Sequence, residues 1–273
     1  MSLRLDARVR MNHGGSIPVF GLGVWQLHGK EAAAAVGHAL AVGYRLIDTA
    51  SMYGNEKEVG QAIRASGVPR DEVFVTTKVW NDEQGYESTV RACDASLKRL
   101  GMGYVDLYLV HWPVKGERQE TWRAMERILK EGKARAIGVS NYMVRHLDEL
   151  KGSAVAPAVN QIELHPFLQP RDAIDRCRER GILVEAYSPL ARGRRLKDPT
   201  LAAVAAKHGK TPAQVMVRWG LQRGFVEIPK SSHPERIEEN ADVFDFTLGA
   251  EEMKALDALD EQHHVTWDPT RQP

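Results

Sequence analysis

The sequence of 273 residues has few cysteines, almost no net charge and no long apolar run. Its two cysteines, Cys93 and Cys177, exclude a disulfide scaffold, and we expect buried, unpaired thiols as in a reducing cytoplasm. A net charge of +1 gives no basic footprint for nucleic acid or a membrane surface. No run approaches the roughly 18 apolar residues of a spanning helix, and residues 1–6 lack an apolar signal core. We therefore predict a cytoplasmic protein without a nucleic-acid or membrane partner.

A glycine-rich dinucleotide-binding motif of the form G-x-G-x-x-G after a strand is missing too, so a Rossmann-type site is not encoded. What is present is an eightfold alternation of short apolar runs and helix-like segments. The runs end on polar or aromatic residues: Val24 and Trp25, Asp48, Lys78, His111, Ser140 and Asn141, Asn160 and Gln161, Tyr187 and Ser188, and Lys230 and Ser231. A strand and a helix repeated eight times in about 250 residues predict an α/β fold, a (β/α)₈ TIM barrel, with a single domain over residues 1–273.

Three additions to the barrel are predicted. Alternating apolar and charged residues over 3–10, followed by a turn over 12–15, indicate an N-terminal β-hairpin over residues 1–18 that plugs the bottom of the barrel. Extra helices late in the chain are expected at about 198–208 and after Thr211, which begins a Thr-Pro-x-Gln capping pattern. Residues 261–273 form an irregular tail. Helices are expected to stop at Gly43 and Gly101.

Four residues with complementary chemistry lie at, or just after, the ends of the second, third and fourth predicted strands: Asp48, Tyr53, Lys78 and His111. Strand ends share one rim of a barrel, so these side chains should converge. A lysine ammonium near a tyrosine lowers the pKa of the phenol, which is otherwise a poor acid at neutral pH. Asp48 would hold the lysine, and His111 would donate to a substrate oxygen. Such a group can protonate the alkoxide that forms when a carbonyl is reduced.

Several motifs in the same order resemble the aldo-keto reductases. They lie at residues 21–25 (GLGVW), 46–50 (LIDTA), 53–56 (YGNE), 108–113 (YLVHWP), 137–141 (IGVSN) and 228–231 (IPKS). The resemblance extends from about residue 16 to 260 and points in particular to bacterial members similar to 2,5-diketo-D-gluconate reductase. It implies NADPH-dependent reduction of aldehydes or ketones. By the same resemblance Tyr53 is the general acid, Lys78 lowers its pKa, Asp48 pairs with Lys78, and His111 orients the carbonyl.

A cofactor site is predicted after the last strand. Lys230, Ser231 and Arg236 surround the start of a helix opened by Pro234, and cations beside helix N-terminal amides can bind an anion. The resemblance implies that these three hold the 2′-phosphate of NADPH or NADP⁺. It further implies contacts to the rest of the cofactor: Ser140, Asn141 and Gln161 to the carboxamide, Tyr187 stacked on the nicotinamide, Ser188 and Leu190 at the pyrophosphate, and Glu239 and Asn240 at the adenine.

The substrate pocket is predicted from tryptophans. Trp25, Trp80 and Trp112 each follow a strand end, and Trp267 lies in the tail, where members of this family set much of their specificity. The sequence alone does not identify the carbonyl substrate.

Two other functions compete. A metallohydrolase needs clustered ligands, and the ten histidines show no His-x-His pair at a strand end, so no metal is expected. A regulatory or structural NADP(H)-binding barrel with little turnover is the second alternative, and the intact set of four catalytic residues argues against it. We expect the protein to act as a monomer.

Overall fold

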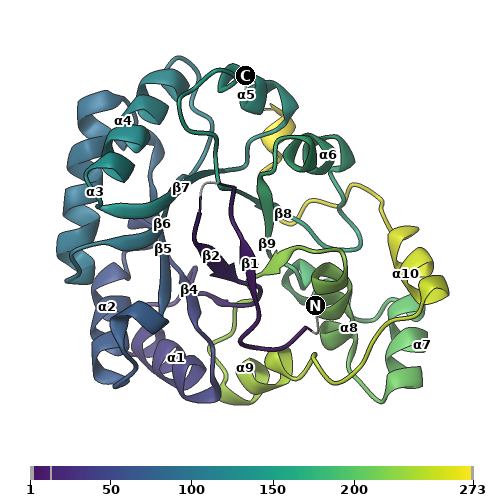
Figure 1. Ribbon diagram of the computed structural model, residues 1–273. Coiled ribbons are helices and arrows are strands. Elements are labelled where there is room, and N and C mark those ends of the chain that lie inside the picture. The colour runs from purple at the N-terminus through teal and green to yellow at the C-terminus, as the bar shows by residue number, and fades with distance from the viewer. Residues whose placement is uncertain (1–2, 13, 272–273) are drawn as a thin grey trace.

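The computed structural model describes residues 3–12 and 14–271 and contains a closed barrel of parallel strands (Figure 1). Seven parallel pairings connect neighbouring strands in the order β3 to β10. A parallel bridge between Phe20 and Glu227 closes the ring, supported by a 2.9 Å hydrogen bond from the Gly21 amide to the Glu227 carbonyl. The predicted (β/α)₈ fold is confirmed. The strands are β3 (Leu22–Gly23), β4 (Leu46–Asp48), β5 (Phe74–Val79), β6 (Val105–Val110), β7 (Ala134–Ser140), β8 (Val159–Glu163), β9 (Leu183–Tyr187) and β10 (Val226–Glu227).

Helices surround the barrel on its outside (Figure 1). They are α1 (Gly29–Val42), α2 (Glu56–Ala65), α3 (Tyr86–Leu100), α4 (Arg118–Lys130), α5 (Val144–Glu149), α6 (Arg171–Glu179), α7 (Pro199–His208), α8 (Pro212–Gln222), α9 (Pro234–Ala241) and α10 (Ala250–Asp257). The predicted late helices are present as α7 and α8, and Thr211 caps α8 through the amide of Gln214. Gly43 and Gly101 end α1 and α3 with φ of 112° and 65°, a left-handed conformation that glycine adopts without steric cost.

Two apolar cores follow from the alternation of side chains along the strands. In β6, Leu107 and Leu109 belong to a cluster inside the barrel, whereas Tyr108 and Val110 belong to the larger cluster between the strands and the helices. Side chains of successive strand residues point to opposite faces, so each strand contributes to both cores. Cys93 and Cys177 are buried and unpaired, as predicted.

The N-terminal hairpin is shorter than predicted. It pairs β1 (Arg8–Arg10) with β2 (Ser16–Pro18), whereas residues 4–7 form a turn closed by a 3.0 Å hydrogen bond from the Ala7 amide to the Arg4 carbonyl. Met11 and Ile17 pack into the cluster inside the barrel, so the hairpin closes its amino-terminal end. Of the predicted hairpin and tail, residues 1–2, 13 and 272–273 lie outside the described residues.

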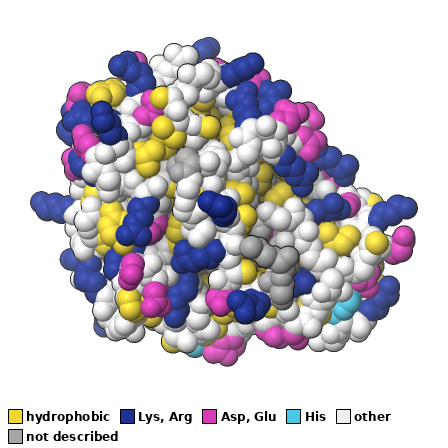
Figure 2. Space-filling model, viewed as in Figure 1, with side chains coloured by type: hydrophobic (Ala, Val, Ile, Leu, Met, Phe, Trp, Pro, Cys, Tyr) yellow, Lys and Arg dark blue, Asp and Glu magenta, His cyan; other side chains and the backbone are white. Residues whose placement is uncertain are grey.

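The first and last barrel strands are also shorter than predicted, since β3 and β10 have two residues each. These two strands are neighbours where the barrel closes, and a single bridge between Phe20 and Glu227 joins the two segments there. On the face of the molecule that carries the hairpin, lysine and arginine side chains are scattered among aspartate and glutamate (Figure 2). Within residues 3–12 and 14–271, no helix combines the length and apolar character needed to cross a membrane.

Candidate active site

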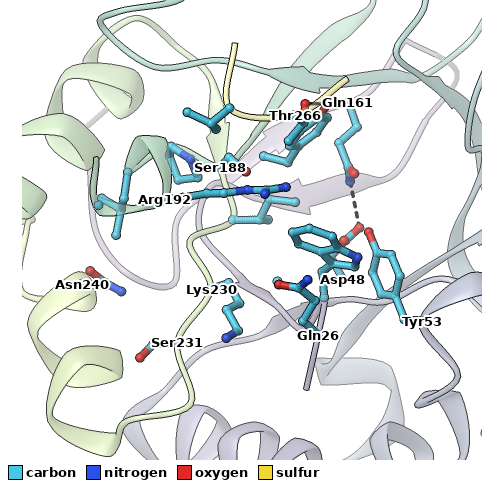
Figure 3. A pocket seen from close by; sticks show the side chains of 18 of the residues that line it. Gln26, Asp48, Tyr53, Gln161, Ser188, Arg192, Lys230, Ser231, Asn240 and Thr266 are labelled. Carbon is cyan, nitrogen blue, oxygen red and sulfur yellow. Dashed lines mark hydrogen bonds between the residues drawn. The ribbon is translucent and has the colours of Figure 1, made fainter. Parts of the chain in front are cut away.

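The carboxyl ends of the strands surround a cavity of about 860 Å³. Every predicted site residue lines it except Lys78, whose side chain is fully buried beneath the floor. Figure 3 shows two ends of this cavity, with Asp48, Tyr53 and Gln161 at one end and Ser231 and Asn240 at the other. Residues from distant parts of the sequence therefore converge as the barrel topology predicts.

Asp48, Lys78 and Tyr53 form a connected group at the first end. The Lys78 Nζ donates to Asp48 Oδ1 at 2.6 Å, to the Thr49 carbonyl at 2.9 Å and to the Tyr53 hydroxyl at 3.4 Å. Asp48 ends β4, Lys78 lies near the end of β5, and Tyr53 ends the short 3₁₀ helix η1 (Ser51–Tyr53). A buried ion pair with Asp48 thus holds the charge of Lys78 beside the Tyr53 hydroxyl. Removal of either member of the pair would leave the other as an uncompensated buried charge.

Burial and the charge of Lys78 act on the pKa of Tyr53 in opposite directions. Burial raises the pKa of this phenol above its ordinary value, and the charge of Lys78 offsets only part of that effect. Burial is the largest influence on Lys78 and opposes its charge, but Asp48, Tyr53 and Glu185 together outweigh it and the pKa of Lys78 is raised. The predicted lowering effect of Lys78 is present, but burial outweighs it and the pKa of Tyr53 lies above its ordinary value. Tyr53 keeps its proton and Lys78 keeps its charge at neutral pH.

His111 completes this end as an uncharged ring. Burial, together with the charge of Lys78, lowers its pKa well below the ordinary value. Its ring stands edge-on to Tyr53 and Trp80, with centroids 5.7 and 5.0 Å apart. The Nδ1 atom is buried without a hydrogen-bond partner among the described residues. An unpaired buried acceptor costs less than an unpaired N–H, so we infer that Nε2 carries the proton and can donate into the cavity.

A second buried carboxyl group, not identified from the sequence, lies under the same end. The Gln161 Nε2 donates at 2.8 Å both to Asp48 Oδ2 and to Glu185 Oε2. Glu185 is fully buried, and burial followed by the charge of Asp48 raises its pKa to about 8. Both amide protons of Gln161 are used in this way, so its carbonyl oxygen is the group left to face a ligand.

The predicted carboxamide contacts lie beside these residues. Asn141 has φ of 63°, and its side-chain amide donates to the His111 carbonyl at 3.0 Å. Its oxygen accepts from the Tyr187 hydroxyl at 2.8 Å, and Ser140 Oγ donates to the Gln161 carbonyl at 2.8 Å. Strands β6 to β9 are therefore joined at their ends by side chains that the sequence predicts to bind a ligand.

The second end of the cavity is built differently. Lys230 and Arg236 are exposed, and no carboxylate pairs with either of them within the part of the chain that the structure describes. Ser231 is buried and α9 begins at Pro234, so its first amides lie next to these cations. This donor set is chemically suited to a phosphate. Glu239 and Asn240 line the same end, and Glu239 accepts from the Thr211 hydroxyl at 2.6 Å.

Aromatic side chains form the walls between the two ends. Trp112 and Trp267 have ring centroids 5.8 Å apart, and Trp267 is 64% exposed at the mouth. The guanidinium of Arg192 lies 4.4 Å from the ring centre of Trp25 and extends toward the middle of the cavity (Figure 3). Arg192 was not predicted, because it lies in the short 3₁₀ helix η4 (Ala191–Gly193), where its positive φ of 51° follows no helix or strand periodicity. The structure groups no three His, Cys, Asp or Glu residues as a metal site among the residues it describes.

Comparisons with known proteins agree with this geometry. The model of the Aldo/keto reductase family matches residues 19–261. The glyoxal reductase of Bacillus subtilis (strain 168) is 49% identical over 271 residues, which cover 98% of both chains. The morphine 6-dehydrogenase of Pseudomonas putida is 47% identical and covers 96% of this chain and 94% of that one. A structure of a Gox0644 variant in complex with NADPH has a TM-score of 0.92 at 42% identity and covers 97% and 98% of the two chains.

Proposed function

This chain belongs to the aldo/keto reductase family and is an NADP(H)-dependent oxidoreductase, and we propose that Tyr53 is the proton donor with which it reduces small aldehydes. The observation that carries the proposal is the Asp48–Lys78–Tyr53 group beside an uncharged His111 at one end of the cavity. A protonated phenol, a fixed ammonium and a neutral imidazole donor are the groups that a carbonyl oxygen needs as it gains negative charge.

In this proposal the carbonyl oxygen lies between Tyr53 and His111. NADPH, when bound, supplies the hydride that the carbonyl carbon accepts. Tyr53 transfers its proton to the oxygen, and Lys78 stabilises the phenolate that remains. Because burial keeps the pKa of Tyr53 high, the phenol stays protonated and ready for reduction across the neutral range. Alcohol oxidation would need the phenolate, so it should be favoured only at alkaline pH.

The residues at the other end fit the cofactor. Two cations without carboxylate partners among the described residues, beside the start of α9, leave unused donors for a 2′-phosphate: Lys230 and Arg236, with Ser231 between them. We propose the remaining contacts as the family resemblance implies them. They are Ser140, Asn141 and Gln161 for the carboxamide, Tyr187 for the ring, Ser188 and Leu190 for the pyrophosphate, and Glu239 and Asn240 for the adenine.

For the substrate we propose small α-oxo aldehydes. The 49% identity to a glyoxal reductase supports this class, as does a reactive end enclosed by His111, Trp80 and Trp112. The finer resemblance to proteins similar to 2,5-diketo-D-gluconate reductase stays a prediction, as do a single domain, a cytoplasmic location and a monomeric state.

The test is oxidation of NADPH, followed by its absorbance, with glyoxal, methylglyoxal, phenylglyoxal and a simple aldehyde. We expect turnover of the first three at rates that depend on protein concentration. Tight binding of NADPH without turnover of any carbonyl would instead support the alternative of an NADP(H)-binding barrel with a regulatory or structural role.

A further inference from the structure

A buried carboxylate outside the catalytic group holds the C-terminal tail against the barrel. Glu163 ends β8, and its side chain is only 2% exposed. Its Oε1 accepts from the Val265 amide at 2.7 Å, and its Oε2 accepts from the Thr266 amide at 3.0 Å and from the Thr266 hydroxyl. Three donors from two adjacent tail residues therefore converge on one carboxylate about 100 positions away in the sequence.

The carboxylate is ionised, although among the described residues no lysine or arginine forms a salt bridge with it and Arg192 acts on it only at longer range. Burial opposes its charge, but hydrogen bonds from His165, Thr266 and Val265 prevail and lower the pKa of Glu163. His165 lies 3.2 Å away, and burial lowers its pKa, so the ring is neutral at pH 7. Hydrogen bonds to an ionised acceptor are the stronger kind, and an acceptor buried without them is costly. Glu163 therefore has its full set of donors only while the tail is in place, because displacing the tail leaves it with His165 alone.

The tail residues held by Glu163 contact the lining of the cavity at two places, through Trp267 and through Tyr187. The residue after Thr266 is Trp267, whose exposed ring packs against Trp112 at the mouth. The Thr266 hydroxyl also lies 3.0 Å from the hydroxyl of Tyr187, which is 2.8 Å from Asn141 Oδ1. The Thr266 hydroxyl donates its hydrogen bond to the Glu163 carboxylate. The Tyr187 hydroxyl has a single proton, and it is therefore shared between the Thr266 hydroxyl and Asn141 Oδ1 as acceptors. Figure 3 shows Thr266 above the end of the cavity that holds Gln161.

We propose that Glu163 is a positioning residue for substrate selection. By fixing Val265 and Thr266 it holds Trp267 as a wall for carbonyl substrates that carry an aromatic group, whereas substrates too small to reach Trp267 do not need it. This inference rests on the proposed reduction of α-oxo aldehydes. It assigns the choice among them to a residue that lies below the tail and not in the tail itself.

Methylglyoxal and phenylglyoxal test the proposal, because they share the reacting group and differ only in a methyl or phenyl substituent. Glu163→Gln replaces one acceptor oxygen by an N–H₂ that faces backbone donors, and breaks at least one of the tail contacts. We expect KM for phenylglyoxal to rise at least ~10-fold, while kcat for both substrates and KM for methylglyoxal stay within ~2-fold. Trp267→Ala should give the same selective loss, and the double variant little more than either single one.

Matched variants separate positioning from general stability. Thr266→Ser keeps the hydroxyl contact and should behave like the parent, whereas Thr266→Val should shift the substrate ratio in the direction of Glu163→Gln. Glu261→Gln removes another tail carboxylate, which pairs with Arg195, and should leave the ratio unchanged. If Glu163→Gln remained folded and both substrates weakened equally, or neither weakened, the proposal would be wrong.

Hydrogen exchange gives a readout that does not depend on activity. The amides of Val265 and Thr266 donate to Glu163, so Glu163→Gln should speed exchange in peptides covering 262–271 and leave those covering β4 to β6 unchanged. A parent protein that turns over neither substrate would refute the proposed function, whatever the exchange shows. Unchanged exchange at the tail in Glu163→Gln would refute the role of Glu163, whatever the activity shows.

Discussion

The two ends of the cavity treat their cations in opposite ways. At the reducing end, Lys78 is fully buried and is held by Asp48 at 2.6 Å. At the phosphate end, Lys230 and Arg236 are exposed, and neither has a carboxylate partner within the described residues. The first end carries the cost of burying charge during folding and gains a fixed geometry for proton transfer. The second end leaves its donors available for a bound phosphate. Substitutions at the first end should therefore change turnover and stability, whereas those at the second should change cofactor binding.

The largest effect is expected from Tyr53→Phe. It removes the hydroxyl that we propose to protonate the substrate, and should lower kcat by at least ~10²-fold, the low end for general acid catalysis. The binding of NADPH, measured by fluorescence titration, should be nearly unchanged, because the ring is not proposed to contact the phosphates. Near-normal turnover in this variant would show that the reducing end is assigned wrongly.

A smaller loss is expected from Lys78→Met. Without the ammonium the Tyr53 phenolate loses its stabilising charge, so kcat should fall at least ~10-fold across the neutral range. Because Asp48 is then buried without its partner, the melting temperature should also fall. Asp48→Asn keeps the lysine and should do less damage to kcat. A pH–rate profile unchanged in Lys78→Met would contradict the coupling between the two side chains.

The phosphate end should respond in binding and not in chemistry. We expect NADPH to bind at least ~10-fold more tightly than NADH, equivalent to about 1.4 kcal/mol. Arg236→Ala should weaken NADPH and leave NADH nearly unchanged, since only the 2′-phosphate distinguishes them. Arg123→Ala, an exposed arginine on α4 that pairs with Glu120, serves as the matched control. Equal losses for both cofactors would mean that Arg236 supports the fold and does not recognise the phosphate.

Sequence patterns predicted the rim of the barrel better than what lies beneath or above it. Residues at strand ends were identified because barrel topology brings all strand ends to one face, whatever the details of packing. Glu163 was not identified as a tail contact, because its partners lie in a segment without periodicity about 100 residues away. The raised pKa of Tyr53 was missed because burial cannot be measured from the sequence. Glu185 looked like an ordinary strand residue between Val184 and Ala186.

The smallest effect on turnover at neutral pH, but a distinct one, is expected from Glu185→Gln. Glu185 shares the amide of Gln161 with Asp48, and its pKa is raised to about 8, so at pH 7 it is mostly protonated and resembles glutamine. Activity at pH 7 should stay within ~3-fold of the parent. Above pH 8, ionised Glu185 raises the pKa of Tyr53 further and weakens it as an acid, so only the parent should lose kcat for reduction there.

Stability should show the same titration with a definite sign. A carboxyl group whose pKa is raised by folding stabilises the native state below its unfolded pKa, and that contribution is lost as pH rises toward the folded pKa, here between about 4.5 and 8. Glu185→Gln removes this loss, so its melting temperature relative to the parent should increase from pH 5 to pH 8.5. Glu227→Gln is the matched control: that carboxyl is also fully buried with a raised pKa, but it shares no hydrogen bond with Gln161. The melting temperature of Glu227→Gln relative to the parent should also increase with pH, whereas its pH–rate profile should match that of the parent. A parent-like alkaline loss of kcat in Glu185→Gln would separate Glu185 from the proton-donating group and leave it a purely structural carboxyl.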